Sequence, residues 1–214
     1  MKALFRIYLF VLILSCFGCH KGMASEVKID TSNSITYCAA VEINDVLCGY
    51  SETTVSPMTL DGEEMQMIVG EVHVLLSLMG EGMDMDFDYE YQCSKNLTSY
   101  VYSRMDVMVG STKINYSTRI EGGIAYYESN LNAKPKTIEL TEDVILETPL
   151  SYPHLLRHFA EGDLKEMTYL VYDDSRGEIV EKKYRMSGRE EIDILGEKRL
   201  SRNAFCSLNA FGTI

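Results

Sequence analysis

Residues 83–93 read MDMDFDYEYQC, and apolar and polar side chains alternate in this stretch without a break. An α-helix would scatter the apolar side chains around its axis, whereas a β-strand places all of them on one face. One face of this strand is therefore expected to pack in a core while the other meets water, as is common in antiparallel sheets. The stretch predicts a half-buried antiparallel strand.

The same period-two pattern recurs in 35–43, in 98–109 and in 114–120. Asp61-Gly62 and the glycines of 80–82 are turn signals between such runs. We also expect a long apolar strand over 64–79 and late strands near 166–173, 178–187, 190–195 and 198–206. The chain is therefore expected to form a series of long hairpins.

One short helix is expected late in the chain. Ser151 is suited to cap it, Pro153 fits its first turn and Gly162 ends it. The fold class we predict is mostly β: one curved antiparallel sheet, or an open half-barrel or sandwich of long hairpins, with one short late helix.

The N-terminal residues have the layout of a secretory signal. Lys2 and Arg6 precede an unbroken apolar run over 7–14, and small residues and cysteines follow. The run is shorter than the about 20 residues that a membrane-spanning helix needs. We expect an exported protein, either periplasmic or anchored in the outer membrane as a lipoprotein.

Two cysteines make this segment resemble a bacterial lipoprotein signal. Gly18 provides the small residue expected before a lipidated Cys19, and Cys16 after Ser15 is the alternative lipidation site. Ordinary cleavage near residues 23–25 stays open as well.

We expect four segments. They are a signal peptide at 1–19, of the lipoprotein type if a cysteine is lipidated, a tether at 20–34, an antiparallel β domain at 35–206 and a tail at 207–214.

An apolar content of 46% and a charged content of 24% suit a folded globular domain. The net charge of −12 argues against nucleic-acid binding, which needs a basic surface, and against electrostatic docking on anionic lipid. The lipid on the N-terminus would then be the contact with the membrane.

Four cysteines follow the signal, and outside the cytoplasm they are able to form disulfides in three connectivities. They are Cys38, Cys48, Cys93 and Cys206. The alternative is that they are small buried apolar residues.

The chain contains 12 Met and 14 Tyr, and several of the Met lie in the long central strands. Methionine side chains adapt to varied apolar ligands, so a sheet that curls without closing is able to hold a lipid-like molecule. The residues expected to line such a site are Met65, Met67, Met83, Met85, Phe87 and Tyr89. The alternative is a plain packed core.

The alternating carboxylates Asp84, Asp86, Asp88 and Glu90 suggest calcium binding, and the spacing of the first three matches the first half of an EF-hand loop. Tyr89 and Lys95 stand where that loop needs Gly and Glu, so the motif fails. A solvated strand face explains these carboxylates better, and no metal site is expected.

His154 and His158 share a face of the expected helix, but the Glu and the third ligand of a zinc site are missing. His73 lies in an apolar strand and is expected to be a hydrogen-bonded, partly buried residue. Cys93 continues the apolar face of a strand, where a thiol is buried and unreactive. We therefore expect no catalytic residue, no bound metal and no cofactor, and we expect that the protein is not an enzyme.

The segment 40–51, AVEINDVLCGYS, resembles the start of a β-domain of unknown function found in bacterial envelope proteins. That domain sometimes precedes a transglutaminase-like protease domain. The expected helix with Leu155-Leu156-Arg157, followed by Gly162-Asp163 and hairpins, is similar too, so that the resemblance covers about 35–206. It implies a curved antiparallel sheet like that of periplasmic lipoprotein carriers. Family members with the protease continue well beyond this point, whereas the present chain stops at Ile214.

Two functions are consistent with these patterns. The first is a non-catalytic exported envelope protein that holds a lipid or another apolar small molecule. The alternative is a structural or interaction module, the accessory domain of a protease-linked envelope family without its catalytic domain. Its protein partner is not identified by the sequence.

Overall fold

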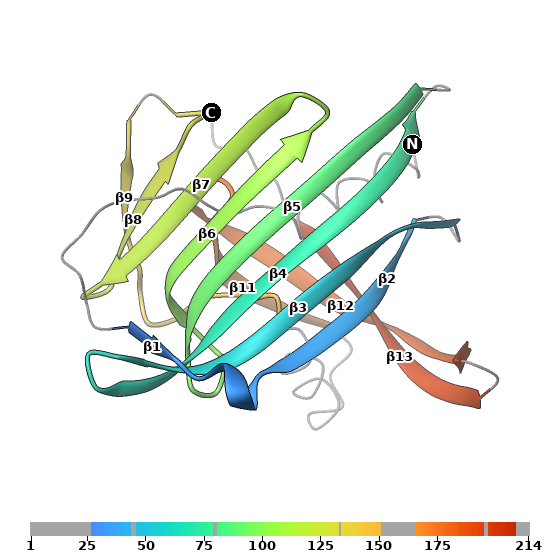
Figure 1. Ribbon diagram of the computed structural model, residues 1–214, viewed down its shortest axis with the longest axis horizontal. Helices are drawn as coiled ribbons and strands as arrows, with labels where there is room; N and C mark the ends of the chain where they lie inside the picture. The colour runs from blue at the N-terminus through green and yellow to red at the C-terminus, as the bar shows by residue number, and fades with distance from the viewer. Residues whose placement is uncertain are drawn as a thin grey trace.

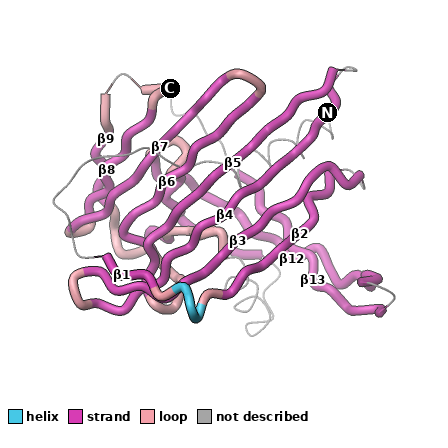
Figure 2. The backbone as a smooth tube through the Cα atoms, viewed as in Figure 1, coloured by secondary structure: helices cyan, strands magenta, loops and turns pink. Residues whose placement is uncertain are grey.

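Long strands make up most of the structure (Figures 1 and 2). The computed structural model describes residues 27–43, 46–78, 81–132, 134–150, 166–194 and 197–208. The strands are β1 (Val27–Ile29), β2 (Ile35–Ile43), β3 (Val46–Leu60), β4 (Glu63–Leu78), β5 (Glu81–Ser94), β6 (Tyr100–Val109), β7 (Thr112–Glu121), β8 (Ile124–Ser129), β9 (Lys136–Glu139), β10 (Val144–Ile145), β11 (Glu166–Asp173), β12 (Glu178–Ile194) and β13 (Glu197–Leu208). Within those ranges the helical content is one 3₁₀ turn, η1 (Thr31–Asn33).

The strands form two sheets. In the nine-stranded sheet, β3 to β9 follow one another in chain order, and every pair is antiparallel. Both β1 and β2 pair with β3 along the same edge, β1 near the end of β3 and β2 along the rest of it. In the described residues β9 does not pair back to β2, so the sheet is open. The second sheet has the order β10-β11-β12-β13, and only its β10–β11 pair is parallel.

The alternation in 83–93 is confirmed. We call the face of the large sheet that carries Phe87, Tyr89 and Tyr91 the inner face, and the opposite one the outer face. These three side chains are at most 7% exposed. The side chains of Asp84 and Asp86 on the outer face are 58% and 55% exposed. A period of two residues therefore assigns each side chain of β5 to the core or to water.

Apolar side chains from β3 to β8 form the main core on the inner face. Ile68, Val74 and Cys93 are fully buried, and Val107 is 4% exposed. The ring of Tyr91 meets the ring of Tyr100 edge to face at 5.3 Å, a favourable aromatic geometry. The inner face of the described strands is thus a packed core.

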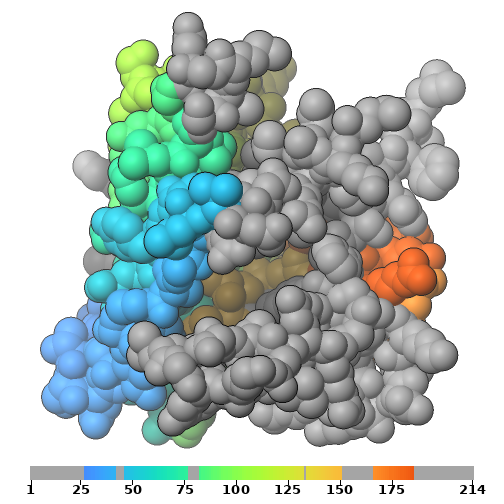
Figure 3. Space-filling model, turned by 90° about the vertical axis from the view of Figure 1, so that its right-hand side faces the viewer, coloured from blue at the N-terminus to red at the C-terminus, as the bar shows by residue number. Residues whose placement is uncertain are grey.

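The second sheet lies behind the large sheet in Figure 1, and in the turned view of Figure 3 the orange residues of β11 and β12 lie on the opposite side of the molecule from the blue-to-green strands. The end of β11 enters the core there. The hydroxyls of Tyr91 and Tyr100 donate to Asp174 Oδ2 at 3.2 and 3.4 Å. The Thr118 and Tyr172 hydroxyls are hydrogen bonded at 3.1 Å. These bonds satisfy polar groups that would otherwise be costly to bury.

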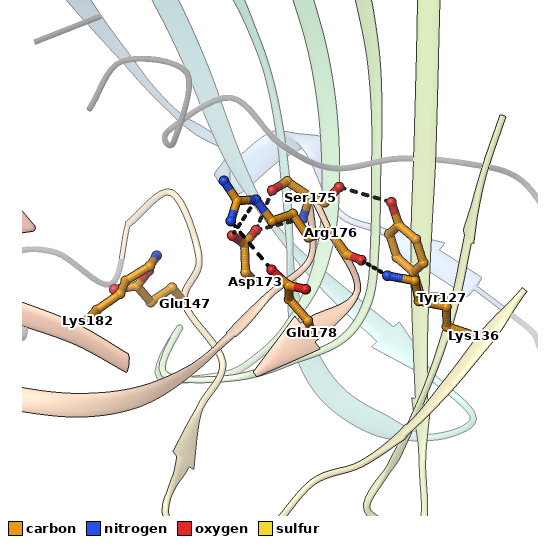
Figure 4. A network of polar contacts seen from close by, with 8 residues as sticks. All are labelled: Tyr127, Lys136, Glu147, Asp173, Ser175, Arg176, Glu178 and Lys182. Carbon is orange, nitrogen blue, oxygen red and sulfur yellow. Dashed lines mark hydrogen bonds and ion pairs between the residues drawn. The ribbon is translucent and has the colours of Figure 1, made fainter. Parts of the chain in front are cut away.

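The turn between β11 and β12 is held by β8 and β9 (Figure 4). The Tyr127 hydroxyl donates to the Ser175 carbonyl at 2.9 Å, and Lys136 Nζ donates to the Arg176 carbonyl at 2.6 Å. The ring of Tyr127 lies on Gly177, where any Cβ would overlap it. The two sheets are therefore joined by specific contacts at this turn.

The mostly β, open antiparallel fold class is confirmed. The late helix expected from Ser151 lies outside the described residues. Three details differ from expectation. Residues 27–29 of the expected tether form β1, the two-residue strand β10 was not foreseen, and the expected strands near 178–187 and 190–195 are one strand, β12. In the part of the chain that the structure describes, no helix is long and apolar enough to cross a membrane.

Candidate ligand groove on the outer face

A groove of about 760 Å³ crosses the outer face from β1 to β6. Its lining includes three apolar side chains: Ile29 of β1 and Met67 and Val69 of β4. Ile29 and Val69 are 47% and 42% exposed, while Met67 is buried. We call this feature the outer groove. It offers an apolar strip on a sheet face that is otherwise largely polar.

The strip exists because β4 is apolar on both faces. Ile68 points into the core and is fully buried, whereas the next residue, Val69, points out into the groove. Met67 packs with Met58 and Met65 in a small second cluster on the outer face. β4 thus supplies the core and the groove at the same time.

A row of carboxylates crosses the groove at right angles to the strands. The register places Glu52 opposite Glu71, Glu71 opposite Asp88 and Asp88 opposite Asp106. All four residues line the outer groove. Neighbouring strands are about 4.8 Å apart, so the four side chains emerge at that spacing. We call this set the carboxylate row.

The row is neutralised at one end. Asp106 accepts a hydrogen bond from Arg104 at 2.7 Å and pairs with Lys113 at 3.3 Å. For Glu52, Glu71 and Asp88, the described residues provide no salt bridge. The groove therefore presents a net negative charge beside its apolar strip.

The electrostatics of Asp88 reflect this position. Partial burial raises the pKa of its carboxyl, and the charges of Asp106 and Glu71 raise it further, against a smaller opposing effect of the Lys113 charge. Both causes disfavour the charged form of the carboxylate. A cation placed in the groove would stabilise the charged form of this carboxylate.

His73 lies on the outer face beyond the groove. Its Nδ1 is 2.6 Å from Asp86 Oδ1 and 3.6 Å from Asp84 Oδ1, and its ring centre is 5.7 Å from that of Tyr50, with the two planes tilted by 32°. The hydrogen bond to Asp86 raises the pKa of His73. The three side chains place one nitrogen and two carboxylate donors within 4.8 Å of one another, a spacing suited to a divalent cation. His73 is partly buried and hydrogen bonded, as expected, whereas Asp84 and Asp86 are exposed, and exposed acidic groups of this kind commonly hold no ion.

The six residues expected to line one apolar site do not share a face. Four of them lie on the inner face, namely Met83, Met85, Phe87 and Tyr89. The other two, Met65 and Met67, lie on the outer face, because the β4–β5 register places them opposite Ser94 and Gln92 and not opposite residues of the inner face. Met67 and Tyr89 both border the outer groove. The prediction that all six side chains line one cavity is therefore wrong.

The cysteines differ in environment. Cys38 is an exposed free thiol and Cys93 a buried one, and they are not joined to each other. Burial raises the pKa of Cys93 to about 12, as its place on the apolar face led us to expect. Cys48 donates to the Val41 carbonyl at 3.3 Å. The side chain of Cys206 is outside the described part, so a disulfide with Cys206 stays a prediction.

Other predicted site residues lie outside the described residues. They are the lipidation candidates Cys16 and Cys19 and the histidines His154 and His158. Of the carboxylates assigned to a solvated face, Asp84, Asp86 and Asp88 are exposed on the outer face, as expected, whereas Glu90 is partly buried and lines the outer groove.

Sequence reasoning missed the cross-strand partners Glu52, Glu71 and Asp106. One signal for them is present, because the two-residue turn Asp61-Gly62 fixes Leu60 opposite Glu63 and hence Glu52 opposite Glu71.

No protein-family model matches the chain, and no curated protein does. Among solved structures, the chain is similar to a β-barrel-like protein of the domain of unknown function DUF1849 from Brucella abortus. The two are 9% identical, with 82% of this chain and 79% of the other chain covered and a TM-score of 0.49.

Proposed function

We propose that the protein is a non-catalytic, exported envelope module that holds an apolar group in the outer groove. The observation that carries this proposal is the position of the groove. It exposes Ile29 and Val69 over the buried Met67 on one side of a sheet whose other side is packed. Exposed apolar strips of this kind commonly mark binding sites.

The inner face is the less favoured place for a ligand. Phe87 is 2% exposed, Val107 is 4% exposed and Ile68 is fully buried, so these side chains already contact protein. A ligand there would have to displace a packed core, which is costly. The outer groove needs no such displacement.

The non-catalytic part of the proposal is supported by the state of Cys93. The thiolate is the reactive form of cysteine, and a pKa of about 12 leaves almost none of it at neutral pH.

The proposal of export and lipidation rests on the sequence of residues 1–19. Cells fed radiolabelled palmitate should label the wild type and Cys16→Ala but not Cys19→Ala. If the label is lost only in Cys16→Ala, the lipidated residue is Cys16. An unlabelled wild-type protein would contradict lipidation.

The groove is tested with Nile red, a neutral apolar dye, added to protein purified without detergent. Val69→Thr keeps the shape of the side chain and replaces a methyl group by a hydroxyl, which should weaken dye binding about fivefold. Val101→Thr is the matched control, because Val101 has a similar exposure of 37% and does not line the groove. Equal losses in both variants, or no dye binding at all, would overturn the proposal.

A second candidate function is the interaction module, and the edge strand β2 favours it. Ile35 and Tyr37 are 57% and 51% exposed, and in the described residues the pairing partner of β2 is β3 alone. Such an edge is able to accept a strand from another protein. A photoreactive residue at position 37 in intact cells should then form one adduct of defined mass. Cells in which no adduct forms would contradict this candidate.

A further inference from the structure

The outer groove combines two chemical features that lie side by side on β4. Glu71 of the carboxylate row and Val69 of the apolar strip are two residues apart on one strand face, about 7 Å along the strand. Met67 continues the strip by about another 7 Å. The groove is thus acidic at one end of this line and apolar at the other.

The acidic end is an unfavourable arrangement for the folded protein alone. Like charges directly opposite each other on neighbouring strands destabilise a sheet. Here Glu52, Glu71 and Asp88 stand in such positions, with no salt bridge among the described residues. Natural proteins accept local conflicts of this kind chiefly at functional sites.

We propose that the ligand of the outer groove is a cationic amphiphile, a small molecule with one amine and one aliphatic chain. The amine lies over the carboxylate row between Glu71 and Asp88, and the chain runs along β4 over Val69 toward Met67. This assignment rests on the proposed function, because it takes the outer groove as the binding site. It names the charge of the ligand that the groove accepts.

The same charges select against other amphiphiles. An anionic lipid or a fatty acid would bring a negative head group to within a few ångströms of the carboxylate row, where carboxylates outnumber the one lining cation, Arg104. A neutral alcohol would gain the apolar contact but no attraction from the row. Charge complementarity therefore ranks amine above alcohol and alcohol above carboxylate.

Three probes with the same chain test this ranking. Octylamine, octanol and octanoate differ at neutral pH mainly in head-group charge. Their binding to the intact protein is measured by displacement of Nile red and by calorimetry at low ionic strength. Octylamine is expected to bind about thirtyfold more tightly than octanol, since each of two carboxylates near 4 Å contributes about 1 kcal/mol in water. Octanoate is expected to bind least, and 1 M salt should abolish most of the amine preference.

The variant Glu71→Gln separates charge from shape. It should reduce the octylamine-to-octanol ratio several-fold and leave octanol binding unchanged. Glu63→Gln is the matched control, because Glu63 is an exposed carboxylate on the same strand that does not line the groove.

The outcomes separate the two levels of the proposal. If octanol and octylamine bind equally, or if Glu71→Gln leaves the ratio of their affinities as in the wild type, the proposal of a cationic ligand is wrong. The outer groove would still be supported as a binding site. If no probe binds and Nile red is not taken up, the groove itself is wrong as a ligand site.

Discussion

The ring of Tyr89 on β5 lies across Gly70 on β4, so closely that a Cβ at position 70 would overlap Cζ and the hydroxyl oxygen of the tyrosine. The two residues are opposite each other in the register, and Gly70 is also opposite Thr53 of β3. The Tyr89 hydroxyl reaches over the glycine and hydrogen bonds with the Thr53 hydroxyl. One side chain therefore ties three strands together directly beneath the outer groove.

Gly70→Ala should destabilise the fold, because the added methyl group meets the Tyr89 ring and the backbone oxygen of Glu52. Overpacking of this kind costs about 1–3 kcal/mol. Urea denaturation measures the change. Gly82→Ala on β5 is the matched control, since nothing lies within 4 Å of a Cβ there, and it should stay within about 0.5 kcal/mol of the wild type. Equal stabilities of the two variants would argue against the Tyr89–Gly70 contact.

Tyr89→Phe keeps the ring over Gly70 and removes only the hydroxyl. The loss of the buried bond to Thr53 should cost about 1 kcal/mol. Tyr37→Phe is the control, since Tyr37 is 51% exposed, and it should be neutral. A Tyr89→Phe variant as stable as Tyr37→Phe would contradict a stabilising role for this bond.

Much of the fold was predictable because face alternation is a local property. In 83–93 each apolar residue was assigned to a packed face, and Phe87 and Tyr91 lie there. The 64–79 segment gave no such signal, because Ile68 and Val69 are both apolar and point to opposite faces. Met65 and Met67 were therefore assigned to the same face as Phe87, whereas they lie on the opposite one.

The carboxylate row was hidden for a different reason. Its members are far apart in sequence and meet only through strand register. The turn at Asp61-Gly62, where both φ angles are positive at 51° and 87°, fixes the β3–β4 register and was recognised as a hairpin signal. Between β5 and β6 the register shifts at a bulge between Gln92 and Cys93, so counting from the turn would misplace Asp106.

His73 should titrate above 6.5, because its hydrogen bond to Asp86 stabilises the charged imidazolium. A raised pKa in the folded state stabilises the fold fully below the unfolded-state pKa of 6.5. That contribution is lost as the pH rises through the folded-state pKa. An NMR titration of the His73 ring measures the shift.

Two variants distinguish the partners of His73. Asp86→Asn should lower the pKa of His73 more than Asp84→Asn does, since Asp86 is at 2.6 Å and Asp84 at 3.6 Å. The reverse order, or no change in either variant, would contradict the assigned hydrogen bond.

Asp88→Asn should make the protein more stable at neutral pH. The folded-state pKa of Asp88 is raised above 3.8 by burial and by the neighbouring carboxylates, so its charge costs stability once the pH is above that pKa. Removal of a like charge from a cross-strand row should add about 0.2–1 kcal/mol in urea denaturation at low salt.

This gain has two signatures that an ordinary surface substitution lacks. It should shrink as the pH falls toward 3.8, where the wild-type carboxyl becomes protonated, and in 1 M salt, which screens the row. Glu63→Gln, outside the row, should show no such dependence. The same Asp88→Asn change should weaken octylamine binding, so that stability and binding move in opposite directions. If Asp88→Asn lowers stability and binding together, the carboxylate row supports the fold and is not kept for a ligand.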